Sequence, residues 1–338
     1  MRVEVTKGAQ VSLEEIAQEL RLGDNFIITF HINPDYDAVG SSLSMFYILK
    51  KMEKNVMIVG DEEENIIRKN FGFLPLSGEI KHVSVLDRLP VEEYTLIALD
   101  SGDERRLGKK VNEYFGRFKK IINIDHHYDN TRFGTLNYVN SDVSGVSEII
   151  YTLVEILGIE LTKELASLIY AGIVGDSGSF RFDSTKPSTH VVASKLLETG
   201  IKPSFFTKNM YQNRSLEFIK FEGELFSKIR STEDKKIVWV IITADLLAKY
   251  NLSESDTEPV VEDIDRIKDC VVYFVIKEKK SKGVITVALR SKDDIDVSQV
   301  AQKFGGGGHK NASGVSFDIS VGIENVEKMI LDELKKII

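Results

Sequence analysis

The chain has 338 residues, of which 42% are hydrophobic and 28% charged, with 24 glycines and 6 prolines. This composition is typical of a globular protein rather than a disordered or fibrous one, and the length predicts about two domains. The formal net charge of −8 argues against a protein that coats long nucleic acid, because such binding needs many Lys and Arg side chains to neutralise phosphates.

Short β-rich runs alternate with helical patterns in the first half of the chain. We predict strands over residues 26–30, 55–59, 95–99 and 120–124, and helices over 39–52, 146–157, 163–174 and 189–198. Gly158 and Gly200 follow two of these helices, where glycine commonly ends a helix. The alternation indicates an α/β fold in residues 1–185, with a mostly parallel sheet and flanking helices.

The second half of the chain has a different pattern. Residues 186–216 are helical and polar, which predicts a helical connector. Strand patterns return at 237–242, 271–276, 284–289 and 313–317, with helices at 297–304 and 323–337. We therefore predict a second, smaller α/β domain over residues 217–338.

The single cysteine and the short apolar runs bear on location. Cys270 has no second cysteine in the chain with which to form a disulfide, which favours a reducing cytoplasm. The first ten residues lack the apolar stretch of a signal peptide, and runs such as 237–242 are far shorter than the ~20 residues that span a bilayer. We expect a cytoplasmic protein without a membrane partner.

Acidic residues and histidines gather in four clusters along the first half. Three clusters begin where a predicted strand ends, and the fourth follows the apolar helix at 165–174 and opens the loop 177–181. The members are His31, Asp35 and Asp37; Asp100; Asp125, His126 and His127; and Asp176. Parallel strands place their carboxyl ends at one rim, where ligands bind. Five carboxylates beside three imidazoles would repel one another when bare, and this predicts two divalent cations, most suitably Mn²⁺.

Simpler explanations exist for each cluster taken alone. An Asp after a strand is often only a helix cap or a turn residue, and a His–His pair is often structural. The recurrence of four clusters, three of them at one predicted sheet rim, favours the metal site.

The four segments resemble the four motifs of the DHH family of phosphoesterases, in order. They read HINPDYDAVGS (31–41), LDSGDERRLG (99–108), NIDHH (123–127) and GIVGDSGSFRF (172–182). The segment VALRSKDDIDVSQVAQKFGGGGHKNASG (287–314) resembles the glycine-rich signature of the DHH-associated C-terminal domain. The match is closest to the stand-alone type with nanoRNase and phosphoadenosine-phosphate phosphatase activity. Two positions depart from the usual pattern, since Tyr36 replaces a small residue and Gly175 replaces a frequent Thr.

The resemblance implies a role for each residue of the site. It assigns His31 and Asp35 to one metal, Asp37, His126 and Asp176 to a second, and Asp100 to both as a bridge. Asp125 would orient His126 or a neighbouring loop by hydrogen bonding, and His127 would face the substrate. Hydrolysis would proceed by in-line attack of a water activated by the two metals.

A glycine run near the C-terminus is a candidate substrate site. Gly305, Gly306, Gly307 and Gly308 lead into His309 and Lys310, and their backbone N–H groups suit a terminal phosphate. Residues 266–310 carry ten Lys or Arg against five acids, which suits a small anionic ligand and also a merely solvated face. The run alone would fit a flexible link or a helix stop. Together with Arg290, which is placed as in the family signature, it indicates substrate binding.

The implied function is an exoribonuclease-type hydrolase with its active site in the cleft between the domains. Expected substrates are short RNA oligonucleotides, including linear dinucleotides cut to nucleoside 5′-monophosphates, and 3′-phosphoadenosine 5′-phosphate cut to AMP, but not stable duplex nucleic acid. A phosphodiesterase for cyclic di-AMP or its linear product pApA stays open, as does a homodimer. An inorganic pyrophosphatase is disfavoured by the glycine-rich signature, and a non-catalytic nucleotide sensor by the complete ligand set.

Overall fold

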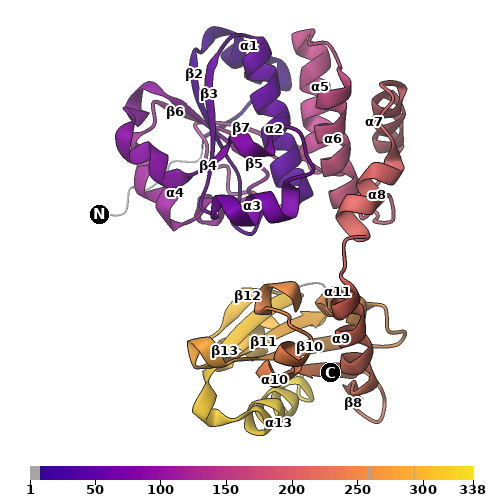
Figure 1. Cartoon of the computed structure of the whole chain (residues 1–338). Helices are drawn as coiled ribbons and strands as arrows, with labels where there is room; N and C mark the ends of the chain where they lie inside the picture. Colours follow the sequence, from indigo (N-terminus) through magenta and orange to yellow (C-terminus); the bar gives the residue numbers. More distant parts are fainter. Residues whose placement is uncertain (1–7, 258–259, 293) are drawn as a thin grey trace. The chain divides into compact units, whose positions relative to one another are not determined.

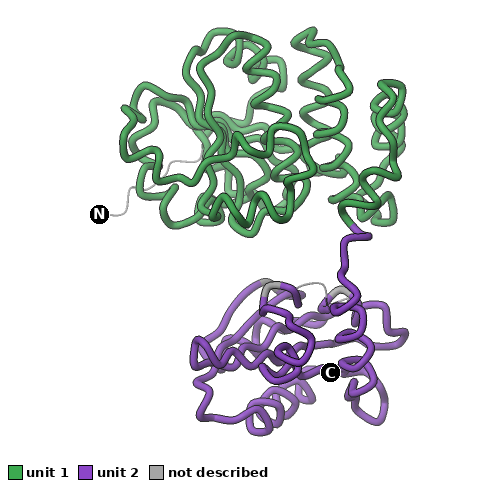
Figure 2. The backbone as a smooth tube through the Cα atoms, in the orientation of Figure 1, with its two compact units in different colours: residues 1–210 green, residues 211–338 purple. Residues whose placement is uncertain are grey.

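The protein divides into two compact units, residues 1–210 and 211–338 (Figures 1 and 2). The computed structural model describes residues 8–257, 260–292 and 294–338. Two helices of the predicted connector, α7 (Pro187–Glu198) and α8 (Pro203–Tyr211), fall in the first unit apart from the last residue of α8. The division of roles at residues 185 and 216 stays a prediction.

The first unit contains a seven-stranded sheet in which every neighbouring pair is parallel. The strand order is β1-β7-β6-β5-β2-β3-β4. The strands are β1 (Ala9–Gln10), β2 (Asn25–Thr29), β3 (Asn55–Gly60), β4 (Ile80–His82), β5 (Thr95–Leu99), β6 (Lys120–Asp125) and β7 (Leu136–Val139). The four predicted strands form its centre, so the predicted α/β fold is confirmed. The strands that sequence reasoning missed are short and lie toward the edges, where little apolar pattern is needed.

Helices cover both faces of this sheet. The helices of this unit are α1 (Leu13–Leu22), α2 (Tyr36–Lys51), α3 (Glu64–Phe71), α4 (Lys109–Tyr114), α5 (Val146–Leu157), α6 (Lys163–Asp176), α7 and α8. Alternate strand residues serve the two faces: Ile28 and Ile97 pack in a core with α1, α2, α5 and α6, whereas Ile27 and Leu96 pack in a second core with α4. Helices therefore pack against both faces of the sheet, with α4 on one face and α1, α2, α5 and α6 on the other.

Two helix boundaries correct the prediction near the acidic clusters. Helix α2 begins at Tyr36 rather than at residue 39, because the Asp35 side chain caps it. Helix α6 runs to Asp176, which is therefore its last residue and not the first residue of a loop. Asp37 and Asp176 are consequently held on helices rather than on flexible segments.

The second unit is a mixed six-stranded sheet with helices on both faces, which confirms a second, smaller α/β unit. Its strand order is β12-β13-β11-β10-β9-β8, and only β9 and β10 pair in parallel. The strands are β8 (Arg230–Ser231), β9 (Ile237–Ile242), β10 (Val272–Lys279), β11 (Val284–Ser291), β12 (Gly307–His309) and β13 (Ala312–Asp318). The helices are α9 (Leu216–Ser227), α10 (Ala244–Lys249), α11 (Val260–Asp265), α12 (Ser298–Lys303) and α13 (Ile323–Leu334). Within the described ranges of both units, no helix has the length and apolarity to cross a membrane.

Candidate metal centre

The acidic clusters meet where the strand order of the first sheet reverses. From β2 the chain moves outward to β3 and β4, and it then returns to the other side of β2 to place β5, β6 and β7. His31 follows β2 and Asp100 follows β5, so both lie at this switch point, and Asp125 ends the next strand, β6. In open α/β sheets such a reversal opens a crevice for ligands at the carboxyl ends of the strands.

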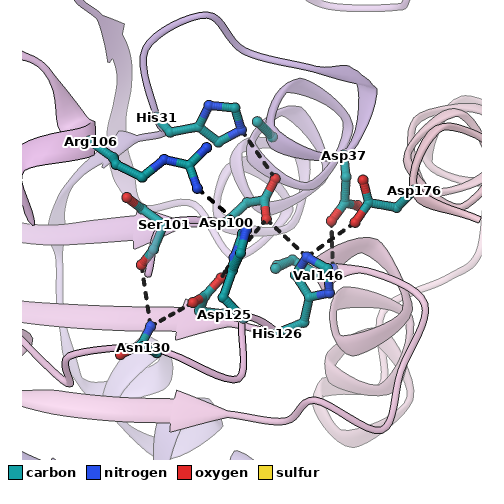
Figure 3. A network of polar contacts seen from close by, with 12 residues as sticks. His31, Asp37, Asp100, Ser101, Arg106, Asp125, His126, Asn130, Val146 and Asp176 are labelled. Carbon is teal, nitrogen blue, oxygen red and sulfur yellow. Dashed lines mark hydrogen bonds and ion pairs between the residues drawn. The ribbon is translucent and has the colours of Figure 1, made fainter. Parts of the chain in front are cut away.

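The side chains of His31 and Asp100 approach each other closely at this rim (Figure 3). Nε2 of His31 lies 3.5 Å from Oδ2 of Asp100 and 3.6 Å from Oδ2 of Asp35. The other oxygen of Asp35 accepts the backbone N–H groups of Asp37 and Ala38, both at 3.0 Å. The simple reading of Asp35 as a helix cap is therefore correct, and the cap leaves its second oxygen facing His31.

Asp37 is fully buried, and the start of helix α5 holds its carboxylate. Its two oxygens accept the backbone N–H groups of Val146 at 2.5 Å and Ser147 at 2.9 Å. The absence of side chains makes room for it: a Cβ on Gly145 would lie 2.7 Å from Oδ2, and one on Gly172 would lie 2.6 Å from Oδ1. These contacts of Asp37 were not predicted from the sequence. The available signal was Gly145, which directly precedes helix α5.

His126 joins Asp37 and Asp176 in a second group. Its Nε2 lies 3.1 Å from Oδ2 of Asp176 and 3.4 Å from Oδ1 of Asp100. Ligand atoms of Asp37, His126 and Asp176 all lie within 4.8 Å of one another, as do those of His31, Asp35 and Asp100. Asp100 and His126 belong to a third such group with His127. This third group shares Asp100 with the His31 group and His126 with the Asp37 group, so it links the two.

These distances fit the presence of cations. Ligand atoms that sit about 2.1 Å from one ion, at angles between about 90° and 109°, lie about 3.0 to 3.4 Å apart. The imidazole–carboxylate separations of 3.1 to 3.6 Å match that spacing better than they match short ionic hydrogen bonds. Oδ1 of Asp100 is buried and has no hydrogen-bond partner among the described residues. Since buried polar atoms are normally paired, this oxygen is suited to a metal ion.

The electrostatics of the bare site show the same need for positive charge. Burial lowers the pKa of His31 and of His126, but the neighbouring carboxylates outweigh it and raise these pKa values to about 10 and about 11. Burial and the nearby Asp176 and Asp100 raise the pKa of Asp37 well above its usual value, and burial raises that of Asp176 to about 6. Without metal, protons on the two imidazoles supply the positive charge that cations would provide.

Asp125 supports His127 and the neighbouring loop, which is the second of its two expected partners, rather than His126. Its Oδ1 lies 2.8 Å from Nδ1 of His127, and its Oδ2 accepts Nδ2–H of Asn130 at 2.6 Å. On its other side, Nε2 of His127 lies 3.5 Å from a guanidinium nitrogen of Arg106. Neither Arg106 nor Asn130 was identified from the sequence. Arg106 lies within the second motif, so its position in a site-bearing loop was the available signal.

Residues of the predicted substrate site line a groove in the second unit. The groove has a volume of about 600 Å³ and brings together Arg290, Gly305, Gly306 and Gly307 with Lys277 and Lys279, which were not predicted. Gly306 and Gly308 are required by the fold, because a Cβ would lie 2.3 Å from the carbonyl oxygen of Gly314 and 2.5 Å from that of Ala312, respectively. A Cβ on Gly307 would meet open space. The backbone of His309 is in β12, but its side chain lies outside what the structure describes.

A parallel sheet whose switch point gathers two Asp and His groups, linked through Asp100 and His126, defines a candidate dinuclear metal centre of the hydrolase type. The chain belongs to the DHH family: the DHH family N-terminal domain matches residues 25–173, and the DHHA1 domain matches residues 234–338. Its relatives named bifunctional oligoribonuclease and PAP phosphatase NrnA include one from Thermus thermophilus, 31% identical over 91% of this chain and 90% of that protein. Another, from Bacillus subtilis, is 30% identical over 89% of this chain and 92% of that protein.

Solved structures share the fold. An exopolyphosphatase-related protein from Bacteroides fragilis superposes with a TM-score of 0.83 over 95% of each chain, at 23% identity. The exonuclease RecJ bound to manganese superposes with a TM-score of 0.52 over 97% of this chain and 95% of that one, at 14% identity. These similarities confirm the architecture expected from the sequence motifs.

Proposed function

We propose that this protein is a metal-dependent phosphoesterase that cuts short oligoribonucleotides to nucleoside 5′-monophosphates and converts 3′-phosphoadenosine 5′-phosphate to AMP. The observation that carries the proposal is the position of Asp100, whose two oxygens lie 3.5 Å from His31 and 3.4 Å from His126. Asp100 thus lies between the imidazoles of the two ligand groups, as a bridge between two ions would. The names of the relatives support the substrate class.

The ligand set suits two Mn²⁺ ions, because carboxylates and imidazoles together favour a transition metal over Ca²⁺. His31, Asp35 and Asp100 would hold one ion, and Asp37, His126, Asp176 and Asp100 the other. Bound there, the ions would lower the pKa of a water molecule and neutralise charge on the phosphoryl oxygens.

His127 and Arg106 are proposed to act on the phosphate itself. Burial lowers the pKa of His127, but the bond to Asp125 and the charges of Asp125 and Asp100 outweigh it and raise that pKa. Because Asp125 occupies Nδ1, the proton available to a substrate is the one on Nε2, on the side of Arg106. We propose that Nε2–H donates to the leaving oxygen and that the Arg106 guanidinium binds a non-bridging oxygen.

The groove in the second unit is proposed to bind the end of the substrate remote from the hydrolysed bond. Arg290 offers a guanidinium for a phosphate, and Gly307 leaves room for close approach to the backbone. An anchor of this kind favours substrates of a few nucleotides. The proposed location is the cytoplasm, which agrees with a lone, buried Cys270.

Product analysis of the purified protein with Mn²⁺ tests the proposed function. The panel comprises phosphoadenosine phosphate, linear dinucleotides, longer RNA, cyclic dinucleotides and pyrophosphate. We expect nucleoside 5′-monophosphates from dinucleotides and AMP from phosphoadenosine phosphate, with slower cleavage of longer RNA. Faster turnover of cyclic dinucleotides or of pyrophosphate would replace the proposed substrate class, and the absence of any turnover would refute phosphoester hydrolysis.

A further inference from the structure

The first turn of α2 and the last turn of α6 are in close contact beside the candidate metal centre. We call the contact between Tyr36 and Gly175 the notch. Tyr36 opens α2 between Asp35 and Asp37, and Gly175 precedes Asp176 at the end of α6. A Cβ built on Gly175 would lie 2.8 Å from Cβ of Tyr36 and 3.7 Å from its Cα and Cδ2. The Cβ of Tyr36 thus occupies the space that a Cβ on residue 175 would need.

Tyr36 cannot move out of this notch by rotating its side chain. The position of Cβ is set by the backbone. The ring of Tyr36 packs edge-on against Phe71, with 5.4 Å between ring centroids, and at a tilt against Phe73, with 6.0 Å between centroids. Helices α2 and α6 also approach closely one turn further along α2, where a Cβ on Gly40 would lie 2.7 Å from the carbonyl oxygen of Leu168. A larger residue at position 175 would therefore have to push the two helix ends apart.

The displacement needed is large on the scale of metal coordination. Carbon atoms in contact normally lie about 3.5 to 4.0 Å apart, so a separation of 2.8 Å has to grow by about 1 Å. Metal–ligand distances tolerate only about 0.2 Å. The residues next to the notch, Asp37 and Asp176, form one candidate ligand group with His126. The fit between Tyr36 and Gly175 consequently sets the spacing of two ligands of the same ion.

We infer that Tyr36 and Gly175 are a matched pair of positioning residues, which fix the separation of Asp37 and Asp176 and thereby the affinity for the second metal ion. The inference rests on the metal-dependent function proposed above. It explains why position 175 carries no side chain: a residue with a Cβ at position 36 requires the glycine at position 175.

The test is a double-mutant cycle on the full-length protein, read out as Mn²⁺ binding rather than as activity. Gly175→Ala, Tyr36→Gly and the double variant are titrated with Mn²⁺, and the free ion is measured by electron paramagnetic resonance. Gly175→Ala should weaken the affinity for one of the two Mn²⁺ ions by about tenfold or more. The double variant, which lacks the opposing Cβ, should bind that ion within about threefold of the parent protein. Gly116→Ala is the matched control, since a Cβ there meets nothing within 4 Å.

The outcomes separate this inference from the proposed function. Rescue in the double variant supports the pair, because two independent structural defects would add rather than cancel. The inference is overturned if Gly175→Ala binds two Mn²⁺ ions with the affinity of the parent protein. It is also overturned if the double variant binds Mn²⁺ no more tightly than Gly175→Ala does. Gly175→Ala could also fail to fold, as judged by its thermal melting in EDTA. In that case, a double variant that folds and binds two Mn²⁺ ions supports the inference. A double variant that does not fold, or that binds fewer than two ions, overturns it. A parent protein that binds no Mn²⁺ refutes the metal-dependent function itself.

Discussion

Replacing Asp100 by Asn removes one negative charge from between the imidazoles of the two ligand groups. Asn has nearly the same volume, and it tolerates the left-handed backbone of this residue, whose φ is 55°. A cation held between Asp100 and either imidazole would lie no farther from the carboxylate than the imidazole nitrogens do, which is 3.4 and 3.5 Å. Unit charges about 3.5 Å apart at an effective dielectric constant of about 20 attract by about 5 kcal/mol. Losing that attraction corresponds to more than a thousandfold in rate.

The assay is turnover of a linear dinucleotide at saturating Mn²⁺, together with the number of Mn²⁺ ions bound. We expect Asp100→Asn to retain the circular dichroism spectrum of the parent, to lose activity by about a thousandfold or more, and to bind fewer ions. Asp269→Asn is the matched control, because this exposed residue of the second unit also has a positive φ, of 65°. Activity of Asp100→Asn within about tenfold of the parent, a change of only ~1.4 kcal/mol, would refute the bridging role.

Three further predictions concern the metals and the groove. Dialysis against EDTA should silence the enzyme, and Mn²⁺ should restore it better than Ca²⁺, which prefers an all-oxygen shell; full activity in excess EDTA would contradict this. Because the carboxylates outweigh burial and raise the pKa values of His31 and His126 to about 10 and about 11, both rings carry protons near neutral pH in the metal-free protein. Mn²⁺ binding should therefore release protons and tighten from about pH 6 to about pH 9, as measured by calorimetry in two buffers; pH-independent affinity would argue against imidazole ligands. Arg290→Ala should impair dinucleotide cleavage but spare a small chromogenic phosphodiester, with the exposed Arg266→Ala as control, and equal losses on both substrates would remove the anchoring role.

Much of the architecture follows from local patterns that the sequence carries by itself. The predicted strand at 95–99 and the helix at 146–157 coincide with β5 and α5, because an apolar run or a 3.6-residue periodicity biases the backbone without help from distant residues. The placement of Asp100 and His126 at one rim also follows, since parallel strands align their carboxyl ends. The short strands β1 and β7 were not predicted, because two to four residues carry too little pattern.

The partners of each site residue were decided only by the tertiary structure. Asp37 is held by the amides of Val146 and Ser147, which lie 109 and 110 residues away in the chain. Asp125 could face either neighbouring histidine, and the turn that brings Asn130 to its second oxygen leaves it bonded to His127. Local sequence patterns bias backbone conformation, whereas hydrogen-bond partners and the closest helix contacts depend on how complete elements pack. For that reason the residues that meet in the candidate metal centre were predictable from the sequence, and the groups that hold them in position were not.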